Sequence, residues 1–226
     1  MAELLPPPSV AAEIRRLLGV KGEADEELEE EIRESYAELR RSAASRSVYR
    51  IFDITVSGDE IEISPALRLR GAELAGLCRG CGRAALMAVT LGAETDRLIA
   101  RRGVENLSRA LILDACASAE AERLCDETEL AIMAEAGEGK FLTMRFSPGY
   151  GGVAQSESAK IIEALDAGRK IGLRLTRSSM LTPMKSVTAV VGLADSPQNR
   201  RRDCVGCAAA ESCPYRMRGA CCGDKA

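Results

Sequence analysis

Cysteine offers the most chemistry of any residue type in this chain, which has nine cysteines and no histidine. Five of the nine follow the pattern C-x2-C-x5-C-x7-C-C near the C-terminus. Four thiolates from one short segment suit an iron-sulfur cluster or a tetrahedral zinc ion. We predict a metal site here, with iron-sulfur favoured over zinc, and unligated or redox-active thiols are the alternative. The expected ligands are Cys204, Cys207, Cys213 and Cys222, with Cys221 as the other choice for the fourth ligand.

The remaining cysteines are expected to be structural. Cys78 and Cys81 form a second C-x2-C pair, but they precede an apolar run and are predicted to be small core residues. Cys116 and Cys125 lie in a helical segment, nine positions apart, which places them on different helix faces. They are expected to pack in the core without sharing a site.

A glycine-rich segment that begins at Arg145 is the strongest ligand-binding signal in the rest of the chain. It runs Arg145-Phe146-Ser147-Pro148-Gly149-Tyr150-Gly151-Gly152. A guanidinium can bind a carboxylate through two hydrogen bonds, and glycines let the backbone approach a ligand closely. The segment is therefore suited to a zwitterionic or nucleoside ligand. The alternative is a tight connection whose arginine caps the C-terminus of a helix.

Composition excludes several classes of function. Without histidine there can be no Ser-His or Cys-His catalytic pair and no histidine-containing metal site. The 31 basic and 34 acidic residues give no overall positive charge that would attract nucleic acid or a membrane surface. The N-terminus lacks the basic and apolar pattern of a signal peptide, and no apolar run is long enough to span a membrane. We expect a soluble cytoplasmic protein.

Helices and strands are interspersed without a regular alternation, which predicts an α+β fold with a mainly antiparallel sheet. The composition becomes polar after residue 194. We therefore expect a folded domain over 1–194 and a cysteine-rich tail over 195–226. Helices are predicted at 9–18, 25–44, 71–77, 92–101, 104–136 and 156–167. Strands are predicted as a hairpin over 48–63 and as single strands at 84–91, 140–146, 171–176 and 186–192.

Three segments in order resemble the activation domain of cobalamin-dependent methionine synthase. The first is the Arg145 to Tyr150 segment, and the second is Ile171-Gly172-Leu173-Arg174-Leu175-Thr176 after a helix. The third contains Met180, Pro183 and Ser186-Val187. The long helix from Ala115 to Glu122 extends the resemblance, which covers roughly residues 9–193.

The resemblance implies that the chain binds S-adenosylmethionine and presents its methyl group to cobalt on another protein. By this resemblance, Arg145 would bind the methionyl carboxylate, and Glu122 would reach the ammonium group or nearby polar groups. Ser147, through its backbone, and Gly149 and Tyr150 would line the ligand. The implied partners are a cobalamin-binding methionine synthase, or another corrinoid protein, and an electron donor. The work is positioning, so no catalytic acid or base is expected, and the chain would be one component of a methyltransferase.

Two departures from the family pattern bear on this function. Val191 and Gly192 stand where the family has an aromatic pair that contacts the ligand, which predicts weak binding or ordering of the ligand only with the partner. The sequence carries no cobalamin, homocysteine or folate module, so we expect it to act on a separate protein. The alternative is a metal-binding adaptor that delivers electrons to a corrinoid protein and no longer binds S-adenosylmethionine.

Overall fold

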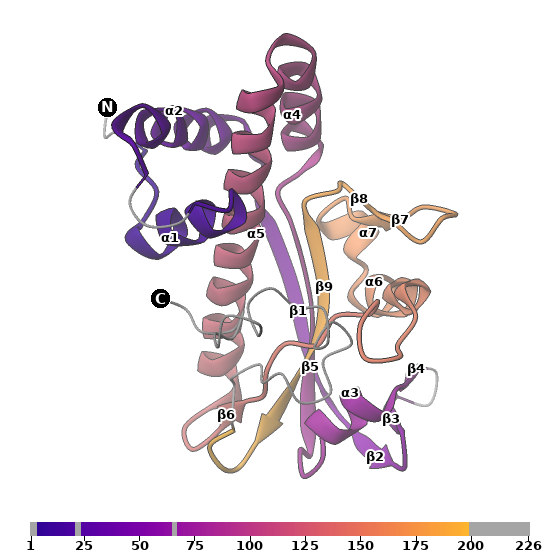
Figure 1. Ribbon diagram of the computed structural model, residues 1–226. Coiled ribbons are helices and arrows are strands. Elements are labelled where there is room, and N and C mark those ends of the chain that lie inside the picture. Colours follow the sequence, from indigo (N-terminus) through magenta and orange to yellow (C-terminus); the bar gives the residue numbers. More distant parts are fainter. Residues whose placement is uncertain (1–3, 21–23, 65–66, 199–226) are drawn as a thin grey trace.

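A four-stranded antiparallel sheet forms the centre of the computed structural model, which describes residues 4–20, 24–64 and 67–198 (Figure 1). The strand order is β1-β5-β9-β6. These strands are β1 (Arg46–Asp53), β5 (Arg83–Thr90), β9 (Ser186–Ala194) and β6 (Phe141–Leu142). The two central strands, β5 and β9, pair over eight residues, from Arg83 opposite Leu193 to Thr90 opposite Ser186.

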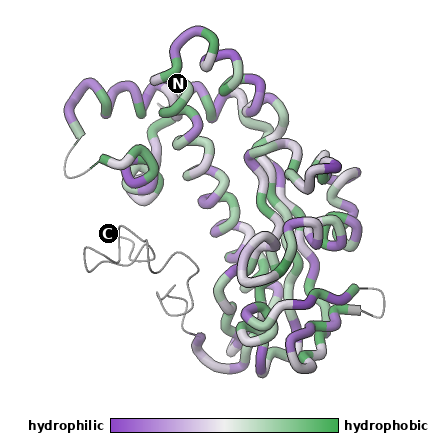
Figure 2. The backbone as a smooth tube through the Cα atoms, turned by 45° about the vertical axis from the view of Figure 1, so that its right-hand side comes forward, coloured by the Kyte–Doolittle hydropathy of each residue, from purple (hydrophilic) through white to green (hydrophobic). Residues whose placement is uncertain are grey.

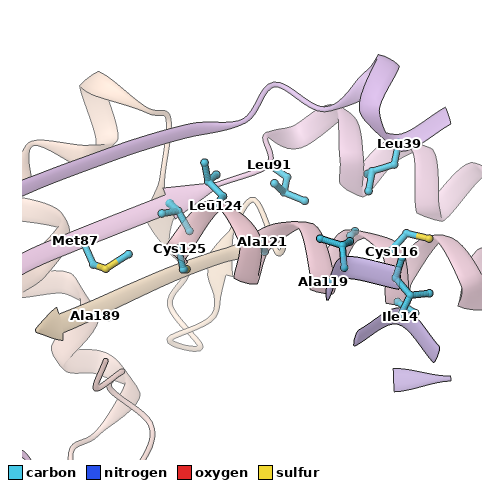
Figure 3. Packing of buried hydrophobic residues seen from close by; sticks show 14 of the residues in the cluster. Ile14, Leu39, Met87, Leu91, Cys116, Ala119, Ala121, Leu124, Cys125 and Ala189 are labelled. Atoms are coloured by element: carbon cyan, nitrogen blue, oxygen red, sulfur yellow. The ribbon is translucent and has the colours of Figure 1, made fainter. Parts of the chain in front are cut away.

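Both faces of this sheet are covered, which explains why β5 is almost continuously apolar. Ala85, Met87 and Val89 face the long helix α5 (Leu107–Ala136), and Figure 3 shows Met87 and Ala189 beside Leu124 and Cys125 of that helix. Leu86 and Val190 belong to a second cluster on the opposite face. In Figure 2 the hydrophobic colour follows the central strands.

The opposite face is covered by short elements. These are α3 (Ala72–Leu77), η1 (Gln155–Glu157), α6 (Ser158–Leu165), α7 (Ala167–Lys170) and a three-stranded sheet of β2 (Thr55–Ser57), β3 (Glu60–Ser64) and β4 (Leu67–Arg70). Two further strands, β7 (Arg174–Leu175) and β8 (Leu181–Thr182), form a small ribbon. The α+β class with mainly antiparallel pairing is confirmed.

Helices α1 (Pro8–Leu17), α2 (Glu26–Ser42) and α4 (Ala93–Glu105) pack on α5 (Figure 1). Asp25 caps α2 by accepting a hydrogen bond from the backbone N–H of Leu28 at 2.8 Å. The prediction of one helix over 104–136 is wrong, because Asn106 leaves the helical conformation at φ −156°. Its side chain accepts from the N–H of Arg109 at 3.1 Å and starts α5, while α4 folds back beside it.

Four other predicted elements differ in the structure. The hairpin over 48–63 is only half correct, because β1 pairs with β5 and only Thr55–Ser57 pairs with β3. The strands predicted at 140–146 and 171–176 are reduced to the two-residue strands β6 and β7. The helix predicted over 156–167 breaks earlier, because Asp166 adopts φ 52° between α6 and α7.

A buried carboxylate joins α2 to α5. The side chain of Glu120 is fully buried and accepts hydrogen bonds from Tyr36 Oη at 2.8 Å and from Arg123 Nε at 2.9 Å. Arg40 of α2 also pairs with it. Two arginines and a phenol thus satisfy one buried negative charge, which ties the two helices together at a fixed point.

No helix in the part of the chain that the structure describes has the length and apolar character needed to cross a membrane.

Candidate functional site

Arg145 lies where the chain leaves β6 and passes along β9. Its neighbour Phe146 forms an isolated bridge with Val190, in which each N–H donates to the other's carbonyl at 2.9 and 2.8 Å. Phe146 packs in the cluster away from α5. Successive side chains of an extended segment point to opposite faces, so the bridge directs Arg145 toward α5.

Three carboxylates of α5 receive the Arg145 guanidinium. Its Nη2 donates to Glu122 Oε2 at 2.7 Å, and its Nη1 donates to Asp126 Oδ1 at 2.9 Å and to Glu129 Oε1 at 2.7 Å. These acids are spaced four and three positions apart, which places them on one helix face. The Arg145 side chain is 16% exposed and Glu129 is buried, whereas Glu122 and Asp126 are about half exposed. The cluster thus has a buried inner end at Glu129 and a solvent-exposed rim formed by Glu122 and Asp126.

In this cluster Arg145 pairs with several carboxylates at once. One guanidinium meets three carboxylates, so the group carries a formal charge of −2 when all are ionised. Burial, the largest effect, lowers the pKa of Arg145, but Cys125, Glu129, Asp126 and Glu122 together raise the pKa above its ordinary value. Arg145 is therefore held in its charged form.

The glycine-rich segment after Phe146 is an ordered loop. Gly149 donates to the carbonyl of Val153 at 2.8 Å, and Val153 donates back to Tyr150 at 2.9 Å. Gly149, Gly151 and Gly152 all have positive φ, between 53° and 101°, where only glycine is unstrained. A Cβ on Gly151 would lie 2.2 Å from Glu73 Oε2 and 2.9 Å from the Phe146 ring. The sequence therefore fixes this loop conformation.

The predicted ligand residues are only partly brought together. Glu122 and Arg145 are in direct contact, which joins two of the five residues. Ser147 is half-buried in the loop that follows, whereas Gly149 and Tyr150 are exposed, with 72% of Tyr150 accessible. Sequence reasoning missed Asp126 and Glu129, although their positions four and seven residues after Glu122 are the signal that could have identified them.

The position where the family has aromatic residues has no space for them here. Val191 is fully buried against α5. A Cβ on Gly192 would lie 2.9 Å from Cys81 Sγ and 2.9 Å from Thr143 Cγ2. Thr143 also accepts from the Gly192 N–H at 2.8 Å through its hydroxyl. Local packing therefore leaves no room for an aromatic pair at Val191 and Gly192.

The predicted metal ligands Cys204, Cys207, Cys213 and Cys222 lie outside the described residues, and their metal site stays a prediction. Within residues 4–20, 24–64 and 67–198, no group of three or more Cys, Asp or Glu side chains is placed to hold a metal ion. Cys116 and Cys125 are residues of α5, and both are buried free thiols in the hydrophobic cluster that this helix helps to form, in line with their expected core role.

The fold and this site together define an α+β domain in which a long helix, α5, packs along an antiparallel sheet. Acidic side chains of this helix pair with Arg145, which precedes the glycine-rich loop. The sequence profile of the vitamin B12-dependent methionine synthase activation domain matches residues 84–200. Because this match spans half of the chain, the protein belongs to that family.

The chain is similar to the MetH reactivation domain, whose crystal structure has AdoHcy bound, with a TM-score of 0.58 and 18% sequence identity. The similarity covers 91% of this chain and 79% of that one, and at this identity it shows the shared fold. No curated protein matches the sequence.

Proposed function

We propose that this protein reactivates a separate corrinoid methyltransferase, most simply a cobalamin-dependent methionine synthase, by binding S-adenosylmethionine and directing its methyl group toward cobalt. Membership of the activation-domain family supports the reactivation role. The AdoHcy in the related MetH domain supports a ligand of this type. The observation that carries the proposal in this chain is the cluster of Arg145 with Glu122, Asp126 and Glu129.

The charge of this cluster fits the charge of the ligand. S-adenosylmethionine carries an ammonium, a carboxylate and a sulfonium, so it has a net positive charge near neutral pH. Arg145 offers a planar donor to the carboxylate, and Glu122 and Asp126 offer acceptors to the ammonium. The ligand carboxylate would replace a rim acid on Arg145, and that acid would turn to the ammonium.

The chain's own residues have a positioning role in this proposal. The loop from Ser147 to Gly152 would hold the adenosyl part through its backbone, because three glycines leave that backbone accessible. Tyr150 would cover the ligand from the exposed side. When bound, S-adenosylmethionine supplies a methyl group to reduced cobalamin on the partner. Orientation of two reactants is the main contribution that such a site can make.

Binding measured by calorimetry tests this proposal. We expect S-adenosylmethionine to bind more tightly than AdoHcy, since AdoHcy has an uncharged sulfur and the cluster is negative. Arg145→Ala should weaken binding by about 1.5–3 kcal/mol, the range for a hydrogen bond to a charged group. Absence of binding, even with the cobalamin-loaded partner present, would refute the proposal and favour the electron-delivering adaptor.

Two glutamates of α5 provide a matched pair for the same assay. Glu122 and Glu127 are both about half exposed and both pair with an arginine, but only Glu122 contacts Arg145. Glu122→Gln should lower the affinity for S-adenosylmethionine several-fold, whereas Glu127→Gln should leave it unchanged. Equal effects of the two changes would show that the helix charge, and no specific contact, governs binding.

A further inference from the structure

A cleft at the end of the molecule where α5 begins is lined by residues of three helices. Helices α2, α4 and α5 pack together there (Figure 1), and the cleft has a volume of about 680 Å³. Its lining consists of Leu4, Leu5, Glu30, Arg33, Glu34, Ala37, Glu38, Arg41, Ser42, Arg102 and Arg109. Arg109 precedes Glu122 by thirteen positions, or about 20 Å along the helix, so the cleft is separate from the Arg145 cluster.

Ion pairs cross this cleft between the helices. Arg102 of α4 donates through Nε and Nη2 to Glu38 Oε1 of α2 at 3.1 and 2.6 Å. Arg109 of α5 donates through Nη2 to Glu34 Oε2 of α2 at 3.2 Å. Arg41 is exposed and has no ion pair among the described residues, and it lies three positions after Glu38, on the same side of α2. Its guanidinium is available to an anion that enters the cleft.

Two buried atoms of the lining have no hydrogen-bond partner within the described part of the chain. They are Arg109 Nε, a donor, and Glu38 Oε2, an acceptor. Buried polar atoms are nearly always hydrogen-bonded in folded proteins, which makes this pair a candidate binding point. The two groups are neighbours, because Arg109 Nη2 is 3.9 Å from Glu38 Oε2, which is too long for a direct hydrogen bond. One small group that both accepts and donates would satisfy the two atoms.

A phosphate group has both properties. Its oxygens accept hydrogen bonds from guanidinium groups. A phosphate ester has a second pKa of about 6, so near neutral pH part of it carries a proton that can be donated to a carboxylate. Sulfate accepts hydrogen bonds but has no proton to donate, so the Glu38 carboxylate repels it. The cleft is larger than one ion, and Leu4, Leu5 and Ala37 give it an apolar part that suits an organic group.

We propose that this cleft binds the phosphate group of a small organic phosphate. Arg109 and Arg41 donate to the phosphate oxygens, and Glu38 Oε2 accepts a hydrogen bond from the protonated oxygen. Arg102 holds the Glu38 carboxylate in place through its other oxygen. The Arg109 side chain is 36% exposed, so it can turn toward a bound group. The site does not depend on S-adenosylmethionine binding at the Arg145 cluster.

Calorimetry of the full chain with phenyl phosphate, inorganic phosphate and sulfate, at equal ionic strength, tests the ligand class. We expect phenyl phosphate to bind most tightly, because its ring reaches the apolar part of the cleft. Inorganic phosphate should bind about ten-fold more tightly than sulfate, since sulfate leaves the Glu38 carboxylate without a donor. Sulfate that binds as tightly as inorganic phosphate would overturn the role of Glu38. Absence of phenyl phosphate binding would overturn the proposal as a whole.

Two glutamates of α2 provide matched variants for this assay. Glu38 and Glu34 both pair with an arginine in the cleft, but only Glu38 has the buried and unpaired oxygen. Glu38→Gln should bring the ratio of phosphate to sulfate affinity to about one, because an amide N–H can donate to either ion. Glu34→Gln should keep the ratio of the wild type. An unchanged ratio in Glu38→Gln would overturn the proposed contact.

An arginine pair tests the anion contact separately. Arg109→Gln should weaken the binding of inorganic phosphate by about ten-fold, the loss expected for a hydrogen bond to a charged group. Arg97→Gln is the control, because Arg97 is an exposed arginine of α4 that pairs with Glu94 and does not line the cleft. Equal affinities in the two variants would overturn the role of Arg109. The comparison of the three ligands uses the unaltered chain, so it decides the proposal even if a variant does not fold.

Discussion

Replacing Glu120 with glutamine tests whether the buried charge cluster holds α2 on α5. The carboxylate is fully buried. It accepts a hydrogen bond from Tyr36 and forms ion pairs with Arg123 and Arg40. Removal of one partner from a buried ion pair costs about 3–5 kcal/mol. The amide keeps the shape and one acceptor, so we expect the low end, about 3 kcal/mol, which lowers the melting temperature of a chain this long by about 6–12 °C.

Glu127→Gln is the matched control for this change. Glu127 also pairs with Arg123 from α5, but its side chain is 53% exposed. An exposed pair of this kind contributes about 0.5 kcal/mol or less. Chemical denaturation followed by circular dichroism gives both free energies of unfolding. An equal loss of unfolding free energy in the two variants would show that the buried Glu120 pairs stabilise the fold no more than the exposed Glu127 pair does.

The pH dependence of stability provides a second measure of the same residue. Burial, the largest effect, raises the pKa of Glu120, but the hydrogen bonds from Arg123 and Tyr36 and the charges of Arg123 and Arg40 give a net lowering. A lowered pKa in the folded state means that the stabilisation is present above the unfolded pKa, about 4.3. It is lost as the pH falls through the folded value. Glu120→Gln should therefore lose less stability than the wild type on acidification, and parallel curves would contradict this.

Three further predictions concern single positions. Asn106→Ala should cost about 1 kcal/mol of unfolding free energy, because the cap on the N–H of Arg109 is lost, and an unchanged denaturation midpoint would argue against the cap. Gly92→Ala should cost about 1–3 kcal/mol, since Gly92 has φ 84° and a Cβ would lie 3.1 Å from that of Ala44; a neutral result in thermal melts would show that the backbone relaxes. Tyr150→Ala should change stability by less than about 0.5 kcal/mol, because the ring is 72% exposed. It should still weaken S-adenosylmethionine binding in calorimetry, and unchanged affinity would remove Tyr150 from the proposed site.

The strongly patterned elements could be predicted from the sequence. Strand β5 was identifiable because six consecutive apolar residues, Ala84 to Val89, form a run that is buried on both faces. The break at Asn106 was not predicted, since the surrounding residues all favour helix and one cap decides the boundary. The pairing of β1 with β5 was also missed, because a local turn signal at residues 57–59 suggested a partner close in sequence.

The candidate site was predictable only in outline. Arg145 and Glu122 came from a family resemblance, and the structure places them in contact. Asp126 and Glu129 belong to the same cluster because of the direction in which Arg145 leaves the sheet, which depends on the bridge between Phe146 and Val190. That bridge joins segments about 44 positions apart, and no local pattern near Arg145 reports it.

The strand order β1-β5-β9-β6 also has a consequence for how the chain folds. The central pair joins Thr90 to Ser186, which are 96 positions apart, so its loop must close at a large entropic cost before any contact compensates. Arg145 and its glycine-rich loop lie within that span, and Phe146 at the start of the loop pairs with Val190 of β9. The ligand site therefore forms late. During synthesis one apolar edge of β5 also stays unpaired until β9 emerges, so we expect the chain to be most prone to aggregate in this interval.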